Sequence, residues 1–393
     1  MTSDTVSNMR IQNPISIGII GGGQLGKMLA QEAKRMSFRV IVLDPSPDSP
    51  ASSISDENII GDFKDENAIK TLANKSDLLT YEIELANSEI LEKLESENFI
   101  VHPAAQTLRI IQNKFRQKSF LKSKSIAVSD FELIDSEKHL VKICDRFGYP
   151  CMLKVCQDSY DGRGNCLITS AKDIHQCYEY LSNRQCFLER FIPFDKEISV
   201  MIARNSSGQI SSFPVAENIH RNSILDMTIV PARISVTATA KAQELAERTI
   251  QAFKGSGIFG IEMFLTRDQN VLINEIAPRP HNSGHYTIEA CSVSQFEQHL
   301  RAILNFPLPK PELLSPAVMV NILGPDDCNG PYVIKGLKDV LSISGVKLHV
   351  YGKKVSKPGR KLGHITVTAN SVEKAIARAE IVKNSIKIED AKG

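Results

Sequence analysis

Short apolar runs alternate with amphipathic stretches along the first hundred residues of the chain. The run Ile15–Ile20 predicts a buried strand, and Gln24 to Met36 carries apolar residues at helical spacing. Further strands are expected at Arg39–Leu43 and Asp77–Tyr81, and a helix at Ser88–Glu95. Strands that alternate with helices predict a parallel sheet covered on both faces, here in a domain of residues 14–112.

The pattern is mixed between residues 113 and 310. A basic helix is expected at Asn113–Lys124 and a longer helix at Ala238–Phe253. Apolar runs predict strands at Cys151–Val155, Gln185–Phe191, Glu197–Ala203, Ser211–Ala216, Ile258–Leu265 and Val271–Ile276. Polar residues at 204–208 and 268–270 favour hairpin turns between these runs.

A smaller C-terminal domain is expected over residues 311–385, after a proline-rich linker. Its apolar runs predict short strands at Ala317–Leu323, Lys347–Tyr351 and Gly363–Thr368, and a helix near Val372–Lys383. The segment is therefore β-rich, and the fold class combines α/β with α+β parts.

The composition is that of a soluble globular protein. The chain has 393 residues, of which 42% are hydrophobic and 23% charged, and its net charge of +2 gives no indication of nucleic acid or an anionic membrane as partner. No apolar run approaches the roughly 20 residues that span a bilayer. The polar residues 1–12 predict a frayed tail rather than a signal peptide, so we expect a cytoplasmic protein.

The eight cysteines lack Cys-x-x-Cys spacing, which disfavours a zinc site. A long chain without an export signal is also a poor candidate for disulfides. We therefore expect reduced, mostly buried thiols.

A glycine-rich turn follows the first predicted strand. Gly21, Gly23 and Gly26 have the spacing of a dinucleotide-binding turn, and Asp44 ends the next strand, where an acid meets a ribose. Taken alone, this pattern favours an NAD-dependent dehydrogenase. The alternative is a turn whose glycines serve only tight packing between strand and helix.

Charged residues interrupt three of the central apolar runs. Lys154 lies in a predicted strand and suits an anion partner, although a lysine at a sheet edge is the alternative. Glu262 and Glu275 lie in two strands joined by a short turn, so their carboxylates are expected side by side. A divalent cation, with Asn274 as a further oxygen ligand, would compensate both charges; ordinary salt bridges are the alternative.

A rigid polar loop follows the second of these strands. Prolines flank Arg279, and His281, Asn282 and Ser283 come next. Such donors can hold a small anion or an acyl phosphate, although a decorated surface loop remains possible.

Six motifs together resemble the carboxyaminoimidazole ribonucleotide synthase family, which has the ATP-grasp fold. They lie at residues 21–26, 160–164, 217–220, 274–285, 294–297 and 358–361, in family order from about residue 15 to 370. The resemblance implies a Rossmann-like N-terminal domain, a central ATP-grasp domain whose lid covers about 130–188, and the small C-terminal domain. It also implies a homodimer.

The implied reaction uses ATP and Mg²⁺. ATP phosphorylates bicarbonate to carboxyphosphate, and the amine of 5-aminoimidazole ribonucleotide takes the carboxylate. By motif, ATP is bound by Lys114, Lys154, Asp161, Gly162, Arg163, Gly164, Glu189, Arg190, Phe191, Ile192, Glu197, His220, Asn274 and Glu275. Magnesium is held by Glu262 and Glu275.

The resemblance further assigns the remaining site residues. Arg279, His281, Asn282 and Tyr160 are the catalytic residues, and Gln24, Glu82, Lys353 and Arg360 bind the ribonucleotide. The chain departs from the family at Asn113 and Lys114, where Asp-Arg is usual, so a bidentate contact becomes a single charge. Ser159 also replaces a frequent glycine.

Other functions remain open at this point. A dehydrogenase explains residues 21–44 but gives no role to the two glutamates or the polar loop. A non-catalytic nucleotide-binding regulator would tolerate loss of a metal carboxylate, yet both are present. Among ATP-grasp enzymes, formate-dependent glycinamide ribonucleotide transformylase is the second candidate, and biotin carboxylase would explain the two metal-binding carboxylates equally well.

Overall fold

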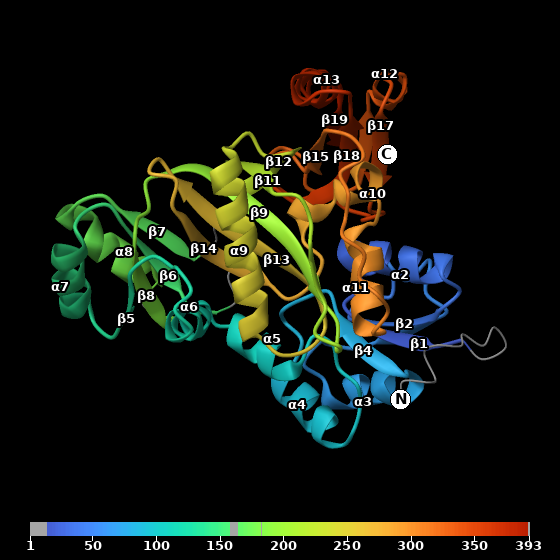
Figure 1. Ribbon diagram of the computed structural model, residues 1–393, viewed down its shortest axis with the longest axis horizontal. Coiled ribbons are helices and arrows are strands. Elements are labelled where there is room, and N and C mark those ends of the chain that lie inside the picture. The colour runs from blue at the N-terminus through green and yellow to red at the C-terminus, as the bar shows by residue number, and fades with distance from the viewer. Residues whose placement is uncertain (1–13, 158–163, 182, 392–393) are drawn as a thin grey trace.

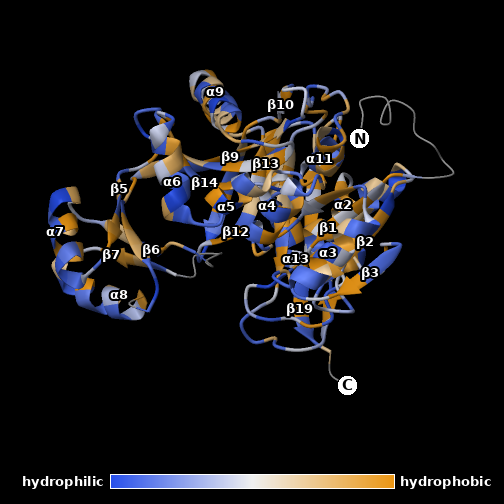
Figure 2. Cartoon of the chain, turned by 90° about the horizontal axis from the view of Figure 1, so that it is seen from below, coloured by the Kyte–Doolittle hydropathy of each residue, from blue (hydrophilic) through white to orange (hydrophobic). Residues whose placement is uncertain are grey.

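The computed structural model describes residues 14–157, 164–181 and 183–391, which form an N-terminal domain, a projecting lid and a central sheet that runs on into the C-terminal segment (Figure 1). The frayed tail expected at residues 1–12 lies outside the described part. In Figure 2 hydrophobic colouring concentrates on the strands, while helices at the periphery such as α7 and α9 carry hydrophilic residues. None of the described helices combines the length and the apolar character needed to cross a membrane.

The described N-terminal sheet is parallel, with strand order β3-β2-β1-β4. Its strands are β1 (Ser16–Ile20), β2 (Arg39–Asp44), β3 (Glu57–Ile60) and β4 (Leu78–Tyr81). Alternate residues of β2 enter opposite cores, because successive side chains of a strand point to opposite faces. Val40 and Val42 pack with α2 (Gln24–Arg35), whereas Ile41 and Leu43 pack with α3 (Glu66–Lys75).

Both faces of this sheet are covered, as predicted. α4 (Ser88–Ser96) and α5 (Ala105–Ile111) complete the cover on the α3 side. The α2 side is completed by α11 (Gln295–Ile303), which comes from a distant part of the chain. The strand β3 and the helices α3 and α5 were not predicted. The helix α3 begins after its cap, Asp65, whose carboxylate accepts from Asn67 N and Ala68 N.

The lid is a small antiparallel sheet of order β5-β8-β6-β7, backed by two helices. Its elements are β5 (Phe131–Ile134), α7 (Glu137–Phe147), β6 (Cys151–Val155), β7 (Asn165–Ile168), η1 (Ala171–Asp173), α8 (Ile174–Leu181) and β8 (Cys186–Arg190). It projects from the rest of the molecule and is reached through α6 (Lys114–Ser123) (Figure 1).

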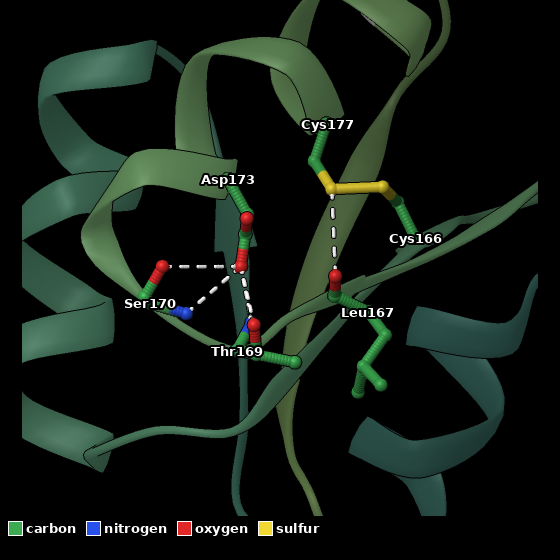
Figure 3. The surroundings of a disulfide bond; sticks show 6 residues. All are labelled: Cys166, Leu167, Thr169, Ser170, Asp173 and Cys177. Carbon is green, nitrogen blue, oxygen red and sulfur yellow. Dashed lines mark hydrogen bonds between the residues drawn. A yellow bond between two sulfur atoms is a disulfide. The ribbon is translucent and has the colours of Figure 1, made fainter.

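One cysteine pair in the lid corrects the expectation that all thiols are reduced. Cys166 in β7 and Cys177 in α8 form a disulfide, with their Cα atoms 5.6 Å apart (Figure 3). The turn between them, in which Asp173 accepts from Thr169 and Ser170, folds α8 back onto β7 and brings the two sulfurs together. The other six cysteines are free and buried, as predicted. Burial raises the pKa of the Cys156 thiol to about 12.

The largest described sheet has nine strands and forms the centre of the molecule. It runs in the order β14-β13-β9-β11-β12-β15-β18-β17, and β10 pairs with β9. The strands from the central segment are β9 (Phe194–Arg204), β10 (Ile210–Ser212), β11 (Ala216–Arg221), β12 (Ile224–Val230), β13 (Gly257–Thr266) and β14 (Val271–Ala277). α9 (Val236–Ala252) packs on one face. The expected strand Ser211–Ala216 is wrong as a single element, since Pro214 cannot donate a ladder hydrogen bond and separates β10 from β11.

The C-terminal segment continues the central sheet. β15 (Ala317–Leu323) pairs antiparallel with β12, and β18 (Lys361–Thr368) and β17 (Val346–Val350) follow. α13 (Val372–Ser385) covers these strands, beside α12 (Leu337–Leu341) and the antiparallel pair of β16 (Tyr332–Lys335) and β19 (Lys387–Asp390). The loop after β14 carries η2 (Asn282–Gly284) and α10 (Thr287–Ala290).

Candidate active site

A cleft of about 1380 Å³ lies where the N-terminal domain, the lid and the central sheet meet. Its walls include the turn after β1, the segment after β4, strands β6, β8, β13 and β14, and the segment between β17 and β18. The predicted site residues that line it are Gln24, Glu82, Lys114, Lys154, Glu189, Arg190, Phe191, Ile192, Glu197, His220, Glu262, Asn274, Glu275, Arg279, His281, Asn282, Lys353 and Arg360. Residues far apart in the sequence thus share one space.

Five predicted site residues remain, of which the structure describes one. Tyr160, Asp161, Gly162 and Arg163 lie outside the described residues. Gly164 is described, and its carbonyl accepts from Val155 N at 2.9 Å. Gly164 is not among the described residues that line the cleft.

The glutamates of β13 and β14 lie side by side, as predicted. Glu262 of β13 and Glu275 of β14 are partners in the antiparallel register. Burial raises the pKa of Glu262 to about 7, and the nearby Glu275 pushes it in the same direction. Burial also pushes the pKa of Glu275 upward, but the ammonium of Lys114, 2.9 Å away, outweighs it and lowers that pKa.

This pair fits a divalent cation that is also bound to phosphates. Among the described residues, no group of three or more His, Cys, Asp and Glu side chains is arranged to hold a metal on its own. Magnesium is commonly held by one or two carboxylates together with substrate phosphates, which needs no third acidic ligand. Glu262 fits this role because a nearby cation would stabilise its buried carboxylate, and Asn274 lines the same wall. The salt-bridge alternative holds in part, through Lys114 and Glu275.

A further carboxylate, that of Glu189 in the lid strand β8, contacts two lysines. Glu189 accepts from Lys154 Nζ at 2.6 Å, from Lys118 Nζ at 2.7 Å, and from Ser129 Oγ. Burial pushes the pKa of Glu189 upward, but the two lysines outweigh it and hold that pKa below its usual range. The Glu189 carboxylate is therefore engaged inside the protein.

His220 and Glu197 form a pair on the floor of the cleft. His220 Nδ1 lies 2.7 Å from Glu197 Oε2. Burial alone would lower the pKa of His220, but Glu197 outweighs this effect and raises it. The two side chains come from β11 and β9, which are neighbours in the sheet.

Three side chains of the polar loop 279–285 line the cleft, those of Arg279, His281 and Asn282. The guanidinium of Arg279 is held by both oxygens of Glu84, at 2.7 and 3.0 Å. Ser283 Oγ lies 2.9 Å from His281 Nδ1, and Ser283 N donates to the same nitrogen, so the ring proton lies on Nε2. That nitrogen lies 3.7 Å from Glu262 Oε1. The loop therefore brings a fixed cation and a neutral imidazole to the carboxylate pair.

Asn282 makes a reciprocal amide pair with Asn321 of β15. Each Nδ2 donates to the other Oδ1, at 3.0 and 2.7 Å. The C-terminal strands thereby hold the end of the loop.

The glycine turn of the N-terminal domain is filled by the chain itself. Gly22 N donates to Asp44 Oδ2 at 2.8 Å, and Gly23 N donates to Glu82 Oε1 at 2.7 Å. A Cβ at Gly23 would lie 2.6 Å from Glu82 Oε1, so the glycines serve the approach of this carboxylate. Burial raises the pKa of Glu82 to about 7. Amides that a pyrophosphate would need are already bonded to acidic side chains, which argues against a dinucleotide.

Two basic residues enter from the segment between β17 and β18. Lys353 Nζ lies 5.8 Å from the ring centre of Tyr351, and Arg360 donates to Val355 O at 3.0 Å. Lys27 of α2 donates to Val350 O and Tyr351 O, which ties this segment to the N-terminal domain.

Comparison with known proteins gives three consecutive matches. The preATP-grasp domain of ribonucleotide synthetases matches residues 15–112, the ATP-grasp domain residues 119–296, and the C-terminal domain of phosphoribosylaminoimidazole carboxylase residues 317–378. The N5-carboxyaminoimidazole ribonucleotide synthase of Bacillus subtilis is 41% identical over 350 residues, which are 89% of this chain and 90% of that protein. The chain belongs to the N5-carboxyaminoimidazole ribonucleotide synthase family.

Solved structures of synthases superpose over nearly the whole chain. The Thermotoga maritima synthetase has 45% identity and a TM-score of 0.88, covering 96% of this chain and 99% of that one. The Aspergillus clavatus synthase, in complex with ADP and 5-aminoimidazole ribonucleotide, has 39% identity and a TM-score of 0.88, covering 95% and 98%. The chain spans 66% of the longer phosphoribosylaminoimidazole carboxylase of Candida glabrata, at 39% identity.

As a member of this synthase family, the chain is an ATP-grasp ligase, which removes the dehydrogenase and the non-catalytic regulator. The site also contains residues that the sequence did not single out. Lys118 follows Lys114 by four residues on α6, a spacing that puts both on one helix face and could have indicated it. Asn321 is the one polar residue in the apolar run of β15. No local signal pointed to Glu84 or Ser129.

Proposed function

We propose that this chain carboxylates 5-aminoimidazole ribonucleotide with bicarbonate at the expense of ATP, in purine biosynthesis. One observation supports the proposal most: Arg279 and His281 lie in the same cleft as the Glu262–Glu275 pair. Basic residues for a ribonucleotide phosphate line the same cleft. The Aspergillus clavatus neighbour holds ADP and 5-aminoimidazole ribonucleotide together, which supports two adjacent sites.

ATP would lie between the lid and β13–β14. Lys154 and Lys114 supply positive charge for its phosphates, and Glu197 and His220 suit the ribose. The segment 190–192 suits the base, through main-chain groups. From their motif, Asp161, Gly162, Arg163 and Gly164 are assigned to the same nucleotide, and Tyr160 to the catalytic residues.

Magnesium would be held by Glu262 and Glu275 together with the ATP phosphates. When bound, it neutralises charge that develops on the transferred phosphoryl group. The protein's own part is orientation: Lys114 fixes the Glu275 carboxylate at 2.9 Å, and β13–β14 pairing fixes the separation of the two acids.

The chemistry proceeds in two steps. An oxygen of bicarbonate attacks the γ-phosphorus, the bond to the ADP oxygen breaks, and carboxyphosphate forms. The amine of the ribonucleotide then attacks the carboxyl carbon, a C–N bond forms, phosphate leaves, and the amine gives up a proton. Arg279 would grip the carboxyphosphate, with His281 Nε2–H and the Asn282 amide beside it, since preorganised donors suit developing anions. Lys353 and Arg360 would bind the ribonucleotide phosphate, and Gln24 and Glu82 its remaining polar groups.

Several coarser properties belong to the same proposal. The parallel sheet and glycine turn support a Rossmann-like N-terminal domain of residues 14–112, followed by domains of residues 113–310 and 311–385. A homodimer and a cytoplasmic location are consistent with the family and with this chemistry.

The second candidate is a formate-dependent glycinamide ribonucleotide transformylase, which would use the same metal pair. The test is ADP release with 5-aminoimidazole ribonucleotide and bicarbonate, compared with glycinamide ribonucleotide and formate. We expect ADP release only with the first pair of substrates. Faster release with the second pair would reject the carboxylation proposal.

A further inference from the structure

The polar loop is held in place by one buried amide. Gln295, the first residue of α11, has no exposed surface. Its Oε1 accepts from His281 N and its Nε2 donates to His281 O, both at 2.9 Å. The same Nε2 lies 3.0 Å from His285 Nδ1. One side chain thus fixes the main chain at the start of the loop and the ring at its end.

The fit around this amide leaves little freedom. A Cβ at Gly284 would lie 2.4 Å from Gln295 Oε1, so the loop closes directly over the amide. Thr287 Oγ1 accepts from Gln295 N at 2.9 Å and donates to Gly284 O at 2.6 Å. Both ends of the glutamine are therefore fixed, and its rotamer cannot change without moving the loop.

One helical turn after Gln295, His299 of α11 contacts β4, the strand that leads to the opposite side of the cleft. His299 Nδ1 accepts from Ile258 N at 3.1 Å, so its Nε2 carries the proton and donates to Thr80 Oγ1 at 2.9 Å. Thr80 lies in β4, two residues before Glu82 and four before Glu84, the partner of Arg279. The same helix face therefore contacts the polar loop and the strand that carries its counter-charge.

We propose that Gln295 is a positioning residue for carboxylation: by bonding both main-chain groups of His281, it sets the loop 279–285 against the β4 segment that α11 also holds. The inference rests on the proposed roles of Arg279 and His281. Gln295 touches neither substrate; it acts through His281. A displacement of about 1 Å in such a loop is enough to lower a rate by about 10²-fold.

Gln298 provides a matched control on the same helix. It is also a fully buried glutamine, and its Nε2 donates to Pro309 O at 2.9 Å, on the side away from the cleft. Replacing either glutamine by leucine removes a buried amide from α11. The two changes differ in whether the lost bonds lead to His281.

The experiment compares Gln295→Leu and Gln298→Leu in the full chain. We expect a larger fall in Tm for Gln295→Leu, which loses three side-chain contacts, than for Gln298→Leu, which loses one. For Gln295→Leu we expect kcat to fall about 10²-fold, an unchanged KM for ATP, and a higher ratio of ADP released to ribonucleotide carboxylated. Gln298→Leu should keep kcat and the coupling ratio. Equal kcat values and equal ratios in the two variants would overturn the inference.

A second variant separates positioning from loss of folding. In Gln295→Glu, a protonated carboxyl offers the same C=O acceptor and an O–H donor, and burial among His281 and His285 raises its pKa above the usual value of about 4.3. Activity relative to the wild type at the same pH should therefore rise as the pH falls. A variant with the pH profile of the wild type, or one inactive at every pH, counts against positioning. Failure of the wild type itself to carboxylate 5-aminoimidazole ribonucleotide would instead refute the proposed function.

Discussion

Two loops face the same cleft, the glycine turn at 21–26 and the polar loop at 279–285, and they use their hydrogen-bonding groups in opposite ways. In the turn, the main-chain donors of Gly22 and Gly23 are occupied by Asp44 and Glu82. In the polar loop, the main chain of His281 is occupied by Gln295, and the side chains of Arg279 and His281 face the cleft. The turn matches a motif for phosphate binding, but two of its amides are bonded to carboxylates of the same chain. The loop matches no general motif, and three of its side chains line the cleft.

The difference lies in which charge the protein supplies. A helix N-terminus attracts an anion, and α2 receives that anion from the chain, as the carboxylate of Glu82. The polar loop instead has the carboxylates of Glu84, Glu262 and Glu275 beside it, and under the proposed function these would favour a cation that bridges to an anion at Arg279. The spacing of glycines alone therefore cannot show whether the main-chain amides of a turn bind a ligand or a side chain of the same protein.

The largest expected effect tests the side of this comparison that concerns the polar loop and the carboxylates beside it. Glu275→Gln keeps the size of the side chain and removes the charge next to Lys114. We expect turnover to fall by about 10³-fold or more, because cation clamping in phosphoryl transfer contributes several kcal/mol. Turnover at saturating Mg²⁺ measures it.

The control for this variant is Glu217→Gln. Glu217 is a buried carboxylate of the same sheet, paired with Lys196 and Arg233 outside the cleft. It should lose stability and keep turnover. Near-normal turnover in Glu275→Gln would remove the metal assignment.

The second prediction concerns Arg279. Arg279→Lys keeps one charge but loses the planar guanidinium, whose Nη2 contacts both oxygens of Glu84 and whose Nη1 donates to Pro280 O. Carboxylation should fall about 10²-fold while the affinity for ATP stays nearly native. Escape and hydrolysis of carboxyphosphate should raise the ADP-to-product ratio.

Arg233→Lys is the matched change, since Arg233 holds Glu217 through two nitrogens away from the cleft. It should leave the coupling ratio unchanged. If Arg279→Lys lost ATP binding while its residual turnover stayed fully coupled, Arg279 would be a nucleotide ligand and not an anion grip.

The fold was predictable where an element carries a strong period of its own. The strands β1, β2, β13 and β14 appear within one or two residues of their expected ends, since apolar residues dominate each run. The split at Pro214 and the disulfide of Cys166 and Cys177 were missed. The first depends on one absent donor and the second on the packing of α8 onto β7, which periodicity does not report.

The cleft-lining residues were predictable mainly through motifs, and their partners were not. Glu262 and Glu275 pair because strand register follows from a short turn. Glu84 meets Arg279 across 195 residues of chain, and Gln295 meets His281 only because α11 packs beneath the loop. Such contacts depend on how domains and helices dock, which no local pattern encodes.

The third prediction tests whether the glycine turn is closed by packing. In Gly21→Ala, the new Cβ would lie 2.6 Å from Glu82 Cγ at a φ of +102°. Gly208→Ala is the control, because Gly208 also has a positive φ (+83°) but no atom within 4 Å of the new Cβ. We expect Gly21→Ala to lower stability by about 2–4 kcal/mol, from strain plus overpacking, and Gly208→Ala by about 1 kcal/mol. Thermal unfolding of the two variants compares them, and equal Tm values would show that Glu82 does not fill the turn.

The smallest expected effect is none at all. Titration with NAD up to about 1 mM should give no saturable binding, whereas ATP with Mg²⁺ should bind in the same assay. The reason is that a pyrophosphate would have to displace Glu82 from Gly23 N and lie beside Asp44.

The pKa of Glu82 is raised to about 7, so its neutral form is populated below that pH and repulsion weakens there. A protonated carboxyl still accepts from Gly23 N through its carbonyl oxygen, so we expect no binding at pH 6 or at pH 8. Binding at pH 6 alone would mean that charge, and not occupancy of the amide, keeps the turn closed. Saturable binding at both values would mean that the turn opens to a dinucleotide and that its likeness to the dehydrogenase motif is functional.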